Sequence, residues 1–467
     1  MSSPDRNWTV GPTLLWFCAY MALGIWYVDG GSIDALADRL THKREADAQP
    51  AGPVFTAKPV VVADARDDEE EPKGAVPAVG GADSDRTKGS ALEDICIDGP
   101  DTACKRWAMD AFYRSVRDEG AGKLGRALRV SWYGDSVIAT DAIPARLRSR
   151  LQGELGDGGP GFVFVVEPHR FCFHEGVTRA HEGAWMTHAV STQQTADGLY
   201  GAGGSSAEAT GGASATFKLN AGKAHKIELY YLAQPKGGTA TVKANGAEVL
   251  TADTAGDKKL AGGASATVAD GASKFAIETK GRVRLFGIGL ENDSGAVVDN
   301  LGIVSVNVKN FQHRNEDNFA AELAHRGADL VMIMIGANEA QWLGPNDTAT
   351  KEYQGHYEKI LMLVRKARPD ATCLVVSPTD QAEAKDGGYV SRPVMPVLVD
   401  AQRRAARAAG CAFFSTYDWM GGKGSAAKWF KRGLVGSDFQ HLSRKGANKF
   451  ADAVFDALMA GYKRYGH

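Results

Sequence analysis

Four polar residues of this sequence could together form the site of a nucleophilic serine. Ser136 and Asn338 each follow an apolar run, and Asp438 lies three residues before His441. An imidazole can take the proton of a serine hydroxyl, and a carboxylate can fix the tautomer of that imidazole. We therefore predict a catalytic triad of Ser136, His441 and Asp438, with Asn338 close to it.

Each of these motifs is weak evidence when taken alone. At average composition, a Gly-Asp-Ser tripeptide occurs by chance in roughly one chain in ten of this length. The alternative interpretation of Asp438 and His441 is an aspartate that caps a turn beside a surface histidine. The combination favours the triad, because the residues occur in the right order and each lies at the end of a predicted element.

The elements that would position these residues alternate between strands and helices. Apolar runs predict the strands, and a period of 3.6 residues predicts the helices. The strands are expected at 128–133, 328–335, 372–378 and 411–415, and the helices at 103–117, 351–367, 394–409 and directly after His441. Such alternation is typical of a doubly wound α/β fold, which binds ligands at the carboxyl edge of its parallel sheet.

The sequence resembles the SGNH hydrolase superfamily in three of that family's four blocks. The matching residues are GDS at 134–136, GANE at 336–339 and DFQH at 438–441. The resemblance covers about residues 91–165 and 295–467, which we expect to be the two parts of one catalytic domain. It implies an α/β, flavodoxin-like three-layer sandwich with a five-stranded parallel sheet, without a metal or a cofactor.

The remaining block departs from the family pattern. VVDNLGIVSVNVKN at 297–310 resembles a segment that usually ends L-G-x-x-G-A, so Ser305 stands where the relatives have a glycine and Gly302 is in place. The resemblance implies an oxyanion hole formed by Ser136, Asn338 and this segment, with Ser305 and Gly302 as candidate donors. A serine N–H can replace a glycine N–H where the backbone does not require a positive φ.

Two further residues of the first and third blocks, Asp135 and Glu339, are expected to bind substrate.

About 165 residues separate the first and second blocks, far more than one crossover in a sheet needs. Within 166–294, apolar and polar residues alternate between Gly, Asn and Asp turns, which predicts an inserted antiparallel β-sandwich. Relatives with carbohydrate-binding-module-like inserts act on O-acetylated polysaccharides, so the resemblance implies a polysaccharide partner. We expect the insert to be removable without loss of activity on small esters. A structural lid without a ligand is the alternative.

The N-terminal region predicts a membrane anchor. Residues 11–28 carry no charge and are long enough to span a bilayer, so 1–28 is interpreted as a tail and transmembrane helix, with a cleaved signal peptide as the alternative. Residues 29–90 are rich in Ala, Pro, Gly and acidic side chains and predict a disordered linker. The expected location is the cytoplasmic membrane, single-pass, with the catalytic domain facing the periplasm or the cell exterior.

The whole-chain composition excludes other classes. The 54 basic and 56 acidic residues give a net charge of −2, which disfavours nucleic acid as a partner. Six cysteines are too few for a disulfide scaffold, although Cys96 and Cys104 flank a turn and are candidates for one local bridge. Four histidines crowd one stretch, but their spacing matches no zinc-ligand pattern, so no metal is predicted. They are His169, His174, His181 and His188.

These observations predict a serine esterase that removes O-acetyl groups from a cell-wall or surface polysaccharide through an acyl-enzyme on Ser136. An O-acetyltransferase would use the same residues. A third possibility is a non-catalytic polysaccharide-binding protein on a hydrolase fold, against which the complete set of polar residues argues.

Overall fold

The computed structural model describes residues 91–100 and 103–465. These residues belong to one compact unit. The expected transmembrane helix at 11–28 and the linker at 29–90 lie outside the described residues. Among the helices that the structure does describe, none has both the length and the apolar character of a membrane span.

A parallel sheet forms the centre of the catalytic domain. Its strand order is β1-β19-β16-β15-β2-β14, and all pairings are parallel except that of β1 with β19. In chain order the five parallel strands are arranged 2-1-3-4-5, which confirms the expected flavodoxin-like sheet. The strands are β1 (Leu92–Glu93), β2 (Leu128–Gly134), β14 (Ala296–Gly302), β15 (Leu330–Met334), β16 (Thr372–Val376) and β19 (Ala412–Phe414).

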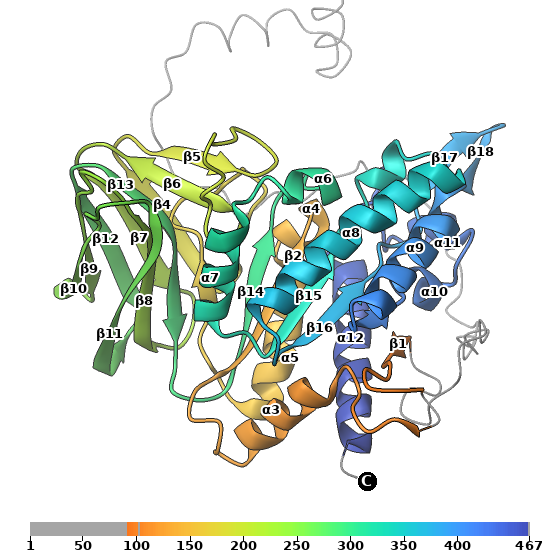
Figure 1. Ribbon diagram of the computed structural model, residues 1–467, viewed down its shortest axis with the longest axis horizontal. Coiled ribbons are helices and arrows are strands. Elements are labelled where there is room, and N and C mark those ends of the chain that lie inside the picture. Colours follow the sequence, from red (N-terminus) through yellow and green to blue (C-terminus); the bar gives the residue numbers. More distant parts are fainter. Residues whose placement is uncertain (1–90, 101–102, 466–467) are drawn as a thin grey trace, which may run out of the picture. The chain divides into compact units, whose positions relative to one another are not determined.

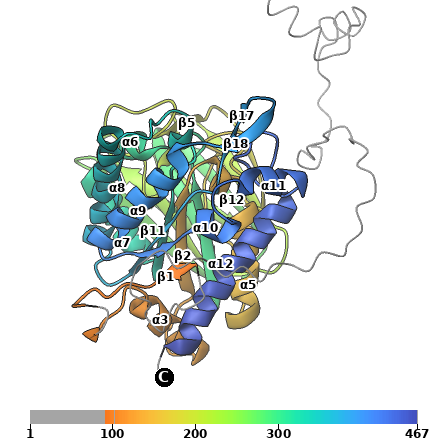
Figure 2. The same ribbon diagram turned by 90° about the vertical axis from the view of Figure 1, so that its right-hand side faces the viewer.

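Helices cover both faces of this sheet, which makes three layers (Figures 1 and 2). Alternate residues of each strand point to opposite faces, so Val331 and Ile333 pack on one helical layer while Leu330 and Met332 pack on the other. One layer contains α6 (Val308–Phe311), α7 (Glu316–Arg326), α8 (Asp347–Ala367) and α9 (Val394–Ala408). The opposite layer contains α3 (Asp110–Gly120), α5 (Ala142–Leu155) and α12 (Arg444–Arg464).

The insert forms two antiparallel sheets with a shared apolar core. One has the order β10-β9-β12-β7-β4, and the other has the order β11-β8-β13-β6-β5 with β3 paired to β13. Because β3 belongs to this sheet, the β-structure begins before residue 166. The strands are β3 (Gly161–Val163), β4 (Val177–Glu182), β5 (Met186–Ala189), β6 (Ser205–Ala209), β7 (Ala213–Leu219), β8 (Ala224–Ala233), β9 (Thr239–Ala244), β10 (Ala247–Asp253), β11 (Leu260–Ala272), β12 (Lys274–Lys280) and β13 (Val283–Glu291).

The insert is packed into the catalytic domain and is not a separate module. Phe162 and Phe286 of the insert share one buried cluster with Tyr133 of β2. A buried guanidinium, that of Arg326 on α7, binds Glu291 of β13 at 2.5 Å and Asp299 of β14 at 2.7 Å. These contacts argue against the expectation that the insert is removable, because its removal would expose this cluster and leave charged groups unpaired.

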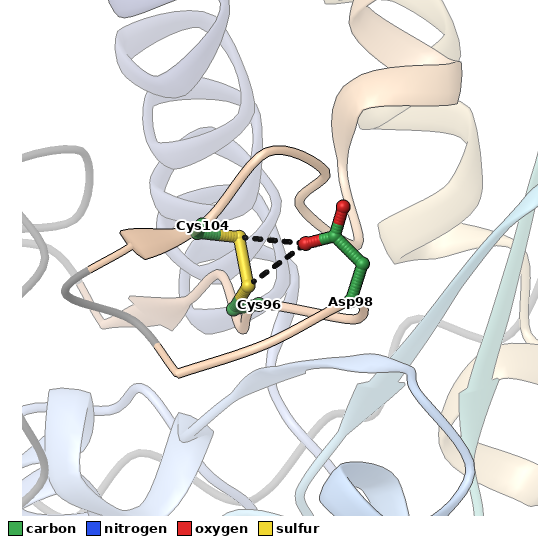
Figure 3. A group of neighbouring side chains, drawn as sticks. All are labelled: Cys96, Asp98 and Cys104. Atoms are coloured by element: carbon green, nitrogen blue, oxygen red, sulfur yellow. Dashed lines mark hydrogen bonds between the residues drawn. A yellow bond between two sulfur atoms is a disulfide. The ribbon is translucent and has the colours of Figure 1, made fainter.

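Two disulfides lie within the described residues. The candidate pair Cys96 and Cys104 forms one of them, and Figure 3 shows it beside Asp98. Asp98 Oδ1 accepts backbone N–H groups at 3.1 and 3.2 Å, and both sulfurs are bonded to each other, so this group is a bridged turn and not a set of thiolate ligands. A second disulfide, Cys373–Cys411, joins β16 to the residue before β19. Within the described ranges, the four crowded histidines form no potential metal cluster.

Candidate active site

The three predicted triad residues are in contact. Ser136 Oγ lies 2.7 Å from His441 Nε2, and His441 Nδ1 lies 2.6 Å from Asp438 Oδ2. Ser136 is 9% exposed, so most of the residue is covered by the protein. This is the geometry in which an imidazole removes the serine proton while a carboxylate holds the ring.

Ser136 is positioned by a sharp turn between β2 and the short helix α4 (Ser136–Ala139). The Asp135 side chain caps this helix by accepting the N–H of Val137 at 3.0 Å. Gly134 is required at the end of the strand, because a Cβ there would lie 2.3 Å from Ile138. Ser136 is the first residue of the helix, so its N–H has no acceptor within α4 and points where negative charge would be stabilised.

His441 is held by the loop that precedes α12. Asp438 Oδ1 accepts the backbone N–H groups of Gln440 and His441, each at 3.0 Å, while Oδ2 accepts from the imidazole. Phe439 takes a positive φ of 55° within this turn. Ser443 then caps α12 by accepting the N–H of Gly446 at 3.2 Å. The segment 438–441 thus forms a turn around the Asp438 carboxylate.

The charges of the triad suit general-base catalysis. The hydrogen bond to Asp438 raises the pKa of His441, against the opposing effect of partial burial. Partial burial opposes ionisation of Asp438, but the bonds from His441 and two backbone N–H groups outweigh it and lower the pKa of that carboxyl to about 2. Asp438 is therefore ionised at neutral pH and stabilises the imidazolium that forms during the reaction.

The second block forms a turn that requires a positive φ. The N–H of Val306 donates to Ile303 O at 3.1 Å, and Ser305 has a φ of 64°. This is a type II turn, whose third position favours glycine. Ser305 therefore carries the strain that a glycine avoids, but its backbone N–H remains in the turn. The side chain is exposed, so the serine is tolerated without a steric clash.

Gly302 has a different part in the site. Its N–H donates to Asn300 Oδ1 at 3.0 Å. A Cβ at this position would lie 2.3 Å from the backbone nitrogen of Ala139. Gly302 thus allows β14 to approach α4 closely, which fixes the helix that begins with Ser136.

Asn338 follows β15 and is linked to both neighbouring blocks. Its Nδ2 donates to Val306 O at 2.8 Å, and its Oδ1 lies 3.5 Å from Gln440 Nε2. One of the two amide hydrogens is thereby used, and the other is left to donate to a bound group.

A glutamine cluster, which the sequence analysis missed, connects these segments. Gln341 Nε2 donates to Gln381 Oε1 at 2.6 Å and to Gln440 Oε1 at 3.1 Å, and Gln381 Nε2 donates to Ala337 O at 2.9 Å. The cluster ties the Asn338 segment to the His441 loop. Three glutamines scattered along a sequence have no spacing that would reveal them.

The predicted substrate residues Asp135 and Glu339 are buried. Asp135 is 1% exposed and Glu339 is 0% exposed, so neither side chain lies on the surface that a substrate would meet. Each instead holds an element: Asp135 caps α4, and Glu339 Oε1 accepts the N–H of Val308 at the start of α6 at 2.6 Å. Burial raises the pKa of Asp135 to about 6 and that of Glu339 to about 7. Substrate binding by these two residues is corrected to positioning of the site.

Comparison with known proteins agrees with this geometry. The model of the GDSL-like Lipase/Acylhydrolase family matches residues 265–448. That range contains Asn338, Asp438 and His441, while Ser136 lies before the insert. No curated protein matches the chain.

One solved structure shares the fold over most of the chain. The structure of a peptidoglycan O-acetylesterase is 25% identical, covers 80% of this chain and 100% of its own, and has a TM-score of 0.68. An acetylxylan esterase from Geobacillus stearothermophilus is 19% identical over 35% of this chain and 73% of its own, with a TM-score of 0.26. A family two carbohydrate esterase from Clostridium thermocellum is 9% identical over 58% of this chain and 97% of its own, with a TM-score of 0.24. Residues 265–448 therefore match the GDSL-like family model, and the domain that contains them has the parallel sheet and the motif residues of a GDSL/SGNH hydrolase.

Proposed function

We propose that this protein is a serine esterase that removes O-acetyl groups from a polysaccharide. The observation that carries the proposal is the contact of Ser136 Oγ with His441 Nε2 at 2.7 Å, continued to Asp438 at 2.6 Å. The similarity to a peptidoglycan O-acetylesterase over 80% of the chain supports acetyl as the acyl group and a cell-wall glycan as its carrier.

In the proposed reaction, His441 Nε2 takes the proton from Ser136 Oγ as this oxygen attacks the ester carbonyl carbon. The ester C–O bond then breaks, and His441 gives the proton to the sugar oxygen, which departs as a hydroxyl. Water, deprotonated by the same imidazole, attacks the acyl-enzyme and releases acetate and free Ser136.

The oxyanion of each tetrahedral intermediate would be bound by three donors. These are the N–H of Ser136 at the start of α4, the free amide hydrogen of Asn338 and the N–H of Ser305 in its type II turn. A single such donor contributes about 3 kcal/mol to transition-state stabilisation. Gly302 serves in this proposal as the residue that sets the distance between β14 and α4.

The proposed location is the outer side of the cytoplasmic membrane, with residues 11–28 as the anchor. The two disulfides support an oxidising compartment, because cytosolic proteins rarely keep such bonds. A large substrate fixed near the membrane would also explain a long linker at 29–90.

The test is acetate release from O-acetylated peptidoglycan and O-acetylated xylan by the wild-type protein and by Ser136→Ala. We expect release from at least one polymer and none with the variant. Addition of an acceptor oligosaccharide distinguishes hydrolysis from acetyl transfer, since a transferase would yield acetylated acceptor in place of acetate. Absence of both products would refute the proposed activity.

A further inference from the structure

Three aromatic side chains are exposed in the part of the chain that the structure describes. Each belongs to a segment that contacts a segment of the active site. They are Phe173, Trp342 and Tyr389. Trp342 is 55% exposed and Tyr389 is 52% exposed. Large aromatic groups left in water are costly, and where they gather they often mark a binding site.

Each aromatic residue contacts a different segment of the triad region. The N–H of Phe173 donates at 2.9 Å to Ala139 O, at the end of the helix that Ser136 begins. The N–H of Trp342 donates at 3.0 Å to Glu339 O and so closes the short helix η2 (Glu339–Gln341), which follows Asn338. Phe173 and Trp342 are therefore held beside two different parts of the site, the Ser136 helix and the Asn338 segment.

Tyr389 lies on a hairpin that packs against the His441 loop. The hairpin consists of β17 (Ala382–Lys385) and β18 (Gly388–Ser391), and Figure 1 shows it at the same end of the sheet as α4, on the side away from the insert. The ring centroid of Tyr389 is 4.5 Å from that of Phe439, which is the residue after Asp438. Tyr389 thus packs on the His441 loop through a tilted ring contact and remains 52% exposed.

The hairpin and the Trp342 segment are fixed to each other. Arg392, which follows β18, donates from Nη2 to Gln341 Oε1 at 2.9 Å, and its N–H donates to Gln381 O at 2.8 Å. Gln341 is the residue before Trp342 and also binds Gln440. The segments that bear Trp342 and Tyr389 are therefore both bonded to the glutamine cluster that joins the Asn338 segment to the His441 loop. The distance between the two rings is thus set before a ligand binds.

The strands of the insert offer no comparable rings. Their aromatic side chains are buried or half-buried, and the large apolar side chains that they expose are Met186 and Leu260. Neither has the flat surface on which a sugar ring can pack. The sequence-based expectation placed polysaccharide binding on the insert, whereas the two most exposed aromatic residues, Trp342 and Tyr389, lie in the catalytic domain.

We propose that Trp342 and Tyr389 are sugar-binding platforms at the rim of the catalytic site, and that polymer recognition resides in the catalytic domain. This inference rests on the proposed esterase function. A pyranose ring has an apolar C–H face that packs flat on an aromatic ring, while its hydroxyls stay in water. Sugars bound there would be neighbours of the acetylated residue, and their binding energy would promote cleavage of polymeric esters without acting on small ones.

The first test compares two substrates for Trp342→Ala and Tyr389→Ala in the full-length protein. We expect kcat/KM on O-acetylated polysaccharide to fall by about three- to tenfold in each variant, with turnover of p-nitrophenyl acetate within twofold of wild type. Trp342→Phe keeps a ring and should recover most of the loss. The matched control is Met362→Ala, which is also exposed but lies near the end of α8, away from the carboxyl edge of the sheet.

The second test measures binding without turnover. In a Ser136→Ala background, co-sedimentation with insoluble O-acetylated peptidoglycan should weaken when Trp342→Ala is added and stay unchanged when Met362→Ala is added. This readout does not depend on ester cleavage, so it separates failure of the platform from failure of the esterase proposal. Equal losses on both substrates, or unchanged polymer turnover and binding in both ring variants, would overturn the inference. The second of these results would leave a protein partner as the explanation of the exposed rings.

Discussion

Asp438 binds His441 through both of its oxygens: Oδ2 contacts the imidazole Nδ1 at 2.6 Å, and Oδ1 accepts the His441 backbone N–H at 3.0 Å. The same carboxylate therefore shapes the loop and orients the ring. A change at Asp438 consequently affects two properties, the position of His441 and its pKa.

Ser136→Ala should abolish esterase activity and leave the fold intact. The hydroxyl makes the covalent bond, and loss of the nucleophile from a Ser-His-Asp triad lowers kcat by about 10⁶-fold. The measurement is hydrolysis of p-nitrophenyl acetate, together with labelling by a fluorophosphonate probe and a thermal unfolding curve. Labelling of the variant at another residue would show that the nucleophile has been misassigned.

Asp438→Asn should reduce the maximum rate and shift its dependence on pH. His441 must be neutral to act as a base, and its bond to Asp438 raises its pKa, so wild-type kcat/KM should fall on the acid side at a pH above the usual histidine pKa. The amide removes the negative charge, which lowers the pKa of His441 and moves this acid limb to lower pH. The rate at the plateau should fall by about 10⁴-fold. An acid limb that does not move would mean that another group controls it.

The sequence predicted the triad because its motifs lie beside regular elements. The parallel strands are apolar runs, and β15 is buried along its whole length. The sequence therefore predicted both this strand and the position of Asn338 just after it. β14 was harder to recognise as a strand, because it contains Asp299 and Asn300 among its apolar residues. Asp299 is tolerated in the core because Arg326, Ser131 and the Phe162 N–H bind its carboxylate, and partners this far away along the chain cannot be seen in a local pattern.

Other features depend on tertiary contacts that spacing does not encode. Asp135 and Glu339 were expected to meet substrate because they adjoin catalytic motifs, but each is buried and caps a helix. The Cys373–Cys411 bridge had a signal that could have been used, since both cysteines lie at the starts of strands that a 2-1-3-4-5 sheet makes neighbours. The β17–β18 hairpin is short and mostly exposed, so it lacks the alternation that predicts a strand.

Ser305→Gly and Ser305→Ala should both keep esterase activity, because the proposed donor is the backbone N–H. Glycine adopts the φ of 64° without strain, so Ser305→Gly should also leave the stability of the fold within about 1 kcal/mol of wild type. Ser305→Val keeps the N–H but disfavours this conformation, and we expect it to lower kcat. The measurement is kcat for p-nitrophenyl acetate in the three variants. A loss of more than tenfold in a folded Ser305→Ala protein would indicate that the hydroxyl is the donor instead.

Arg326→Met should destabilise the whole catalytic domain. The guanidinium is 3% exposed and binds both Asp299 and Glu291, so its removal leaves two buried carboxylates without this partner. Breaking a buried ion pair in this way costs about 3–5 kcal/mol. The measurement is urea unfolding followed by tryptophan fluorescence. Arg117→Met is the matched control, because its ion pair with Asp118 is at the surface and should change the unfolding midpoint little.

Removal of residues 1–90 should release the protein from membranes and leave its activity on p-nitrophenyl acetate unchanged. The triad and every strand of the central sheet lie after residue 90, and the described chain begins with β1, whose Leu92 pairs with Phe414 of β19. A second truncation that removes residues 1–97 is the matched comparison. It deletes β1 and Cys96, so it loses both an edge strand and the Cys96–Cys104 bridge, and it should be less stable than the first. Cell fractionation and thermal unfolding test the pair. If the shorter deletion yields an insoluble protein, the region before residue 91 contributes to the core and is more than an anchor and a linker.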